Sequence, residues 1–131
     1  MKKMKICVSA SSDSLDANVD PRFGRCSYFV IVNSETMEFS AILNDSTNAS
    51  HGAGIQAAQT VVNVGAKVII TGNVGPNAFN VLSAAGLKLV TGVSGSIKEA
   101  IEKYKSGKLQ ETGNPTVGGH FGMGKGQGRG R

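Results

Sequence analysis

The sequence lacks the features that would mark a membrane, exported or disulfide-stapled protein. No apolar run approaches the roughly 20 residues that span a bilayer. The opening residues 1–11, MKKMKICVSAS, contain basic residues but only a short apolar run, so they predict a strand and not a signal peptide. Cys7 and Cys26 are the only cysteines, too few for a disulfide framework. We therefore expect a cytoplasmic protein with free thiols and no membrane partner.

The chain also lacks the patterns of the commoner enzyme sites. It has no Walker motif, no dinucleotide fingerprint, no Cys-x-x-Cys pair and no Gly-x-Ser-x-Gly turn. Asp13, Asp16 and Asp20 share one long loop, but the expected strands 4–11 and 66–72 carry no carboxylate, which two-metal nuclease chemistry would need. We predict that the protein is not an enzyme.

Positive charge is concentrated at the C-terminus. The net charge is +5, and residues 113–131 contribute +3 of it through Lys125, Arg129 and Arg131 without any acid, which leaves +5 − 3 = +2 for the rest. The segment 113–131 is glycine-rich and has almost no apolar periodicity, so we expect it to be a disordered tail. The folded body is then one domain, residues 3–112, and we do not expect it to bind nucleic acid.

The body alternates between strand and helix patterns. We expect β-branched or alternating strands at 4–11, 27–33, 37–43, 66–72 and 87–92, and helices at 53–65, 76–86 and 96–107. Each helix would end at a glycine, the residue that best adopts the left-handed closing conformation. Ser96 and Glu99 have the spacing of a capping box at the third helix.

These elements predict an α/β fold with a five-stranded mixed sheet and three helices. The short turn NSET makes the second and third strands antiparallel neighbours, and helices separate the last three strands, which then run parallel. The loops after strands one, three, four and five would leave from one edge of the sheet. The N-termini of all three helices, with their unpaired N–H groups, would lie at that edge and favour an anionic ligand.

Four motifs carry a resemblance to a known family. DPRFGRCSYFVIV, SHGAGIQAAQ, ITGNVGPNAFNVLSAAG and GVSGSIKEAIEKYKSGKL occur in register across nearly all of residues 5–112. The chain thereby resembles the dinitrogenase iron–molybdenum cofactor-binding family of nitrogenase accessory and carrier proteins. The resemblance implies a three-layer ribonuclease-H-like fold. It also implies carriage of an iron–sulfur or molybdenum-containing cluster as cargo, with cofactor-assembly proteins as donors or acceptors. Many relatives have a histidine where this chain has Arg22.

The candidate site residues come from the glycine-rich edge and these motifs. Backbone or side-chain contacts to the cargo are predicted for Ser9, Arg22, Phe23, Gly24, Arg25, Ser50, Gly52, Gly54, Asn73, Gly75, Pro76, Asn77, Gly92 and Gly95. His51 and Cys26 are the predicted metal ligands, and Arg25 would favour the Cys26 thiolate. The alternatives are that His51 only caps its helix and that Cys26 is a packed core residue.

Two other functions stay open at this point. The same edge could hold a phosphorylated or nucleotide substrate of an enzyme that depends on His51. The basic tail, with His120 and Met123, could instead bind nucleic acid or a larger assembly, which would make the fold a platform only.

Overall fold

The computed structural model describes residues 4–44 and 53–113. Its elements in chain order are β1 (Lys5–Ala10), the 3-10 turn η1 (Phe23–Arg25), β2 (Tyr28–Asn33), β3 (Phe39–Leu43), α1 (Ala53–Asn63), β4 (Val68–Ile70), α2 (Pro76–Ala84), β5 (Lys88–Val90) and α3 (Ile97–Lys105). Among these residues no helix has the length and apolarity to cross a bilayer.

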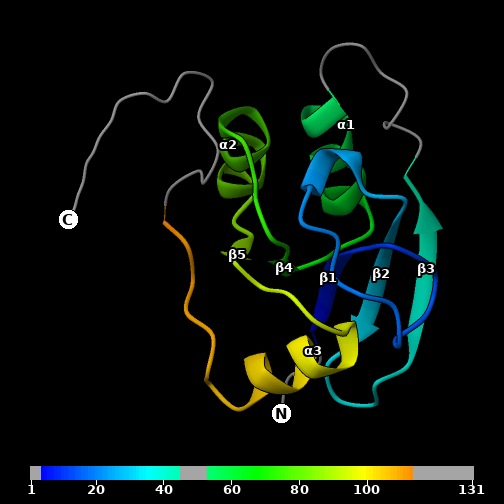
Figure 1. The fold of residues 1–131 in the computed structure, drawn as a ribbon. Helices are drawn as coiled ribbons and strands as arrows, with labels where there is room; N and C mark the ends of the chain where they lie inside the picture. Colours follow the sequence, from blue (N-terminus) through cyan, green and yellow to red (C-terminus); the bar gives the residue numbers. More distant parts are fainter. Residues whose placement is uncertain (1–3, 45–52, 114–131) are drawn as a thin grey trace.

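The five strands form one mixed sheet in the order β3-β2-β1-β4-β5 (Figure 1). β2 is antiparallel to both β1 and β3, whereas β1, β4 and β5 are mutually parallel. The predicted fold class is confirmed, including the reversed second strand. Because β1, β4 and β5 run in the same direction, the loops that follow them all leave from the same edge, which we call the carboxyl edge.

Alternation along the strands produces two hydrophobic cores, one on each face of the sheet. Ile6 and Val8 of β1 point into the core that α3 covers, while Cys7 between them points into the core that α1 and α2 cover. Figure 1 shows α3 lying apart from α1 and α2. Burial of such side chains, roughly 1.5–3 kcal/mol each, holds the three layers together.

The predicted ends of the helices are confirmed, but the predicted start of the third strand is not. Gly65, Gly86 and Gly107 follow the three helices with φ of 85°, 83° and 79°, the left-handed closure that the sequence predicts. The third strand begins at Phe39 and not at residue 37, because Met37 has φ 65° and its N–H donates to the Asn33 carbonyl at 2.8 Å. The turn after β2 is therefore longer than NSET.

The long loop between β1 and β2 is anchored to the loop after β4. The Asn73 N–H donates to the Pro21 carbonyl at 2.8 Å, and the Phe23 N–H donates to the Asn73 carbonyl at 3.3 Å. Gly72 lies so close that a Cβ there would stand 2.6 Å from the Pro21 Cα. We call this pairing of residues 21–23 with residues 72–73 the seam, and it fixes Arg22 against the end of β4.

Both cysteines lie in the core beneath α1 and α2. Cys7 and Cys26 are fully buried free thiols. Burial raises the pKa of Cys26 to about 12, and the nearby Asp20 charge adds to this effect, while burial also holds the pKa of Cys7 well above its usual value. This burial favours the protonated thiol of Cys26 and works against the thiolate that Arg25 is expected to favour.

We expect Gly72→Ala to destabilise the protein by about 1–3 kcal/mol, because its Cβ would meet the Pro21 backbone, which cannot move aside without breaking the seam. Denaturant unfolding measures this loss. Gly113→Ala is the control, since nothing lies within 4 Å of its added Cβ, and it should change stability by less than about 0.5 kcal/mol. Equal stability of the two variants would contradict the close approach.

The buried thiols predict a stability loss in alkali. The folded pKa of Cys26, about 12, lies above the 9.0 of an unperturbed thiol, so its stabilising contribution is complete below pH 9.0 and is lost as the pH rises towards about 12. The free energy of unfolding should therefore fall between pH 9.0 and about pH 12. The matched control is the double variant Cys7→Ala/Cys26→Ala, in which the fall should be smaller. An equal fall in both proteins would refute the burial of the thiols.

Candidate functional site

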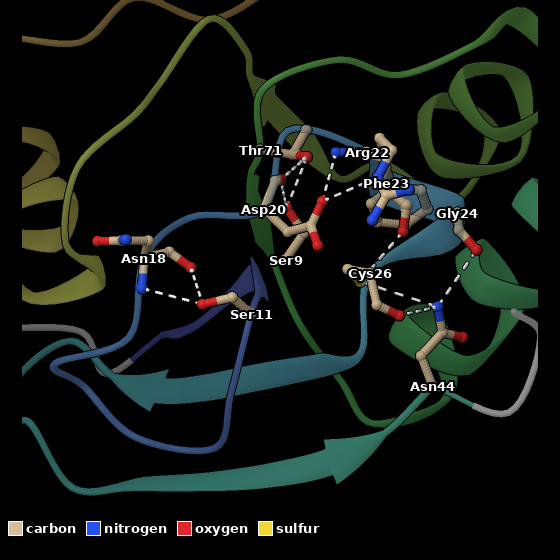
Figure 2. Close-up of polar contacts among 10 residues, drawn as sticks. All are labelled: Ser9, Ser11, Asn18, Asp20, Arg22, Phe23, Gly24, Cys26, Asn44 and Thr71. Atoms are coloured by element: carbon tan, nitrogen blue, oxygen red, sulfur yellow. Dashed lines mark hydrogen bonds and ion pairs between the residues drawn. The ribbon is translucent and has the colours of Figure 1, made fainter.

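Arg22 is held at the carboxyl edge by the carboxylate of Asp20. Asp20 Oδ1 accepts the Arg22 backbone N–H at 2.9 Å and lies 3.4 Å from Nε of the same residue (Figure 2). The Arg22 side chain is 66% exposed and that of Asp20 only 9%. The carboxylate therefore orients the Nε side of the guanidinium from the interior of the protein. The outer side of the guanidinium stays available to an anion.

Beneath Asp20 lies a buried polar contact between β1 and the end of β4. The Ser9 hydroxyl is 2.7 Å from the Asp20 carbonyl oxygen and 2.7 Å from the Thr71 hydroxyl. Ser9 and Thr71 are fully buried. Ser9 was predicted to contact cargo, but in the structure its side chain supports the loop that carries Arg22 and does not reach the surface.

The start of α2 stands beside Arg22 across the seam. Its cap, Gly75, offers no side-chain hydrogen bond, and Pro76 occupies the first helical position, where a missing N–H has no cost. Within residues 4–44 and 53–113, nothing accepts a hydrogen bond from the N–H groups of Asn77 or Ala78. The exposed side chains of Asn73 and Asn77 flank this helix start.

The start of α1 lies next to the start of α2. Gly54, the second residue of α1, packs so closely that an added Cβ would lie 3.4 Å from the Ala78 Cβ. Since α1 and α2 cover the same face of the sheet, their positive ends reinforce each other at one place. We define the rim as Arg22, Gly24, Arg25, Gly54, Asn73, Gly75, Pro76 and Asn77.

The start of α3 does not belong to this rim, which corrects the prediction that all three helix starts converge. α3 covers the opposite face, and its first N–H groups are already used: Ile97 donates to Ala17 at 2.9 Å and Lys98 to Leu15 at 3.1 Å. The predicted cap is confirmed, since the Ser96 hydroxyl accepts the Glu99 N–H at 3.1 Å. No donor of this first turn is left for an anion.

Gly92 and Gly95, two of the predicted cargo contacts, form backbone hydrogen bonds within the protein. The Gly95 carbonyl accepts the Val19 N–H at 2.9 Å, and the Gly92 N–H donates to the Gly72 carbonyl at 2.8 Å. Both have positive φ, 76° and 91°, so they shape the loop that receives residues 15–19.

Two other predicted site residues belong to the interior. Phe23 is 2% exposed, and its ring centroid lies 5.3 Å from that of Phe29. Cys26 is buried next to it, with its sulfur 3.3 Å from the Phe23 carbonyl oxygen. Phe23 thus anchors η1 in the core, and the alternation of buried and exposed residues through 22–26 leaves Arg22 and Arg25 facing solvent.

Asn44 is a structural residue that the sequence did not reveal. Its side-chain amide donates to the Cys26 carbonyl at 2.9 Å and to the Gly24 carbonyl at 3.2 Å (Figure 2). It therefore closes the Phe-Gly-Arg turn from the end of β3. No local motif predicts this contact, because Asn44 and Cys26 are 18 positions apart in the sequence.

Ser50, His51 and Gly52 lie outside the described residues, as do His120 and Met123. Along 4–44 and 53–113, no three His, Cys, Asp or Glu side chains gather into a metal-binding group. Surface cavities of about 310, 740, 570 and 400 Å³ are lined by residues away from the rim, the second of them by Met4, Tyr104 and Leu109 among others. None of these four cavities is lined by a residue of the rim.

Known proteins resemble this chain over most of its length. A protein from Methanocaldococcus jannaschii is 34% identical over 114 residues, which cover 85% of this chain and 93% of the relative. The apo form of the orange protein from Desulfovibrio gigas superposes with a TM-score of 0.85 at 40% identity, covering 87% of this chain and 97% of that one. An NMR structure from Thermotoga, of a protein assigned to the DUF35 family, gives a TM-score of 0.74 at 31% identity, with 87% and 99% covered.

The same relationship appears in the comparison with protein families. The model of one family, described as dinitrogenase iron-molybdenum cofactor, matches residues 4–107. This match includes the seam, both helix starts of the rim and the whole sheet. The chain belongs to the dinitrogenase iron-molybdenum cofactor family.

Proposed function

We propose that this protein is a non-catalytic carrier for an anionic iron–sulfur or molybdenum-containing cluster, which it binds at the rim. The observation that carries the proposal is the pair of adjacent helix starts beside Arg22, where no described residue accepts a hydrogen bond from the N–H groups of Asn77 and Ala78. Membership of a family named for a metal cofactor supplies the class of cargo. A solved relative at 40% identity is described in an apo form, which supports the idea of a removable ligand.

Binding at such a rim rests on charge and hydrogen bonding. The N–H groups at the start of α2 would donate to sulfide or oxide atoms at the cluster surface, and Arg22 would add a charge-assisted contact. Asp20 and the seam hold these groups in place before the cargo arrives, so that little ordering is required on binding. The contacts would also break readily, as transfer between assembly proteins requires.

Metal ligation is a separate part of the proposal. His51 stays a predicted ligand, placed by the sequence just ahead of α1. Cys26 is a poor candidate, since its thiol is buried and its pKa is raised to about 12. A ligand role for Cys26 would require the residue to lose its proton and to leave the core, so we do not retain it in the proposal.

Arg22→Ala tests the rim directly. Tetrathiomolybdate, a small metal–sulfur anion, is titrated into the apo-protein and its visible absorption recorded. Loss of a charged hydrogen bond, about 1.5–3 kcal/mol, should weaken binding by roughly 10- to 100-fold. Lys105→Ala is the control, because it removes another exposed cation from the C-terminal end of α3 and should bind like the wild type. No uptake above an unrelated protein, or equal affinity in all three proteins, would sink the proposal.

The variants His51→Ala and Cys26→Ala distinguish metal ligation from hydrogen bonding of the cargo at the rim. If His51 coordinates the metal, its replacement should shift the absorption bands of the bound cluster, because a metal ligand changes. Cys26→Ala should leave those bands in place while lowering stability. The opposite pattern, a shift only with Cys26→Ala, would show that the thiol is the ligand and would overturn our choice.

A further inference from the structure

β3 is the last strand on its side of the sheet and pairs with β2 (Figure 1). Backbone bonds just before and just after it show which way its hydrogen-bonding groups point. Before β3, the Asn33 N–H donates to the Glu38 carbonyl at 2.8 Å. After β3, the Asn44 N–H donates to the Ser27 carbonyl at 3.0 Å. Because successive residues of an antiparallel strand bond to alternate sides, the even-numbered residues of β3 bond to β2 and the odd-numbered ones point away from the sheet.

Phe39, Ala41 and Leu43 therefore direct their backbone N–H and C=O groups outwards. Nothing in residues 4–44 and 53–113 forms a hydrogen bond with these groups. Such an unpaired row is a template for another strand, and edge strands usually carry proline or charged side chains that prevent the pairing. β3, with the sequence FSAIL, carries neither. The outer edge of β3 can therefore accept a further strand.

The same strand carries exposed hydrophobic side chains. Within the described part of the chain, the exposed large hydrophobic residues are Phe39, at 43%, and Leu43, at 62%. Side chains alternate along a strand, so both lie on the same face as Ala41, which packs against the core that α3 covers. A cavity of about 570 Å³ lies on this face, and Phe39, Met37 and Leu15 are among its lining residues. The edge thus offers apolar contacts beside its free backbone groups.

These features are symmetric about Ala41 and match a second copy of the same strand. With antiparallel strands and a two-fold axis at Ala41, this residue faces the partner's Ala41, and Phe39 faces the partner's Leu43. All outward-pointing residues then lie opposite one another, where antiparallel strands exchange both N–H···O bonds. A shift of one position would oppose outward-pointing and inward-pointing residues, and a shift of two would separate Phe39 from Leu43. One register therefore satisfies both the backbone and the side chains.

We propose that β3 pairs with β3 of a second copy of this chain, which gives a two-fold symmetric dimer with one continuous sheet. Phe39 of each copy would pack against the partner's Leu43, removing both side chains from water. β3 contains no charged residue, so no like charges oppose one another across the axis. The contact uses the same surface of both copies and therefore closes at two. This inference does not depend on the carrier function, and the two rims would face opposite ends of the joined sheet.

Leu43→Lys tests the dimer in solution. Sedimentation of the full chain between about 1 µM and about 1 mM should show a monomer that becomes a dimer as the concentration rises. Leu43→Lys should weaken this association at least about 10-fold, because each copy would place an ammonium group against Phe39 of the other. Leu43 is mostly exposed, so the monomer should keep its fold, which thermal unfolding checks.

Gln59→Lys is the matched control. It adds the same charge at an exposed position of α1 and should dimerise within about twofold of the wild type. A wild type that stays monomeric up to about 1 mM would overturn the proposal. Equal association of the wild type and both variants would overturn it too, because the contact would then lie elsewhere. Species larger than a dimer would contradict the closed two-fold contact.

A distance measurement tests the register independently. Glu38→Cys places one accessible thiol just before β3, since Cys7 and Cys26 are buried and do not compete for a spin label. The axis lies three positions from residue 38 on each strand, so the two labelled backbone sites should be about 20 Å apart in the dimer. Pulsed electron resonance at high protein concentration should detect this separation. Absence of a dipolar signal, or a distance that does not fit this register, would overturn the pairing.

Discussion

The seam between residues 21–23 and residues 72–73 is the contact on which the rest of the site depends. β1 and β4 are parallel neighbours, but the loop that follows β1 is long and would have no fixed course without the exchange of hydrogen bonds between Asn73 and its partners. Gly72 lets the two backbones approach to a distance that a side chain would forbid. The buried Ser9, Thr71 and Asp20 contacts lie directly below, so the seam is supported from the interior.

Once the seam is formed, the electrostatics of the rim follow from local geometry. Asp20 is nearly buried and fixes the root of Arg22, while Phe23 in the core turns Arg22 and Arg25 towards solvent. The seam ends where α2 begins, so the cations stand beside a helix N-terminus that lacks a side-chain cap. The arrangement is asymmetric. α1 and α2 direct their positive ends to one side of the sheet, whereas the first N–H groups of α3 donate hydrogen bonds to residues around Ala17.

The two halves of the loop between β1 and β2 thus have different structural roles. Residues 15–19 cap α3 on one face, and residues 20–25 build the rim on the other. A single connection crosses the carboxyl edge and joins the two layers of helices. Changes in the middle of this loop should therefore affect both the stability of α3 and the position of Arg22, because the backbone bonds of Val19 and Asp20 are adjacent.

The hydrophobic periodicity and the turn residues of the sequence determined the element types, the mixed sheet with its reversed second strand and the three helix-ending glycines. These features depend only on neighbouring residues and on chain direction. The family resemblance also came from the sequence. Tertiary structure alone decided that α3 covers the opposite face, that Ser9 and Phe23 are interior residues and that Asn44 closes the Phe-Gly-Arg turn. The raised pKa of the Cys26 thiol likewise follows from its burial in the tertiary structure. Each of these outcomes depends on which distant segments pack together and how much water they exclude, and no local pattern encodes that information.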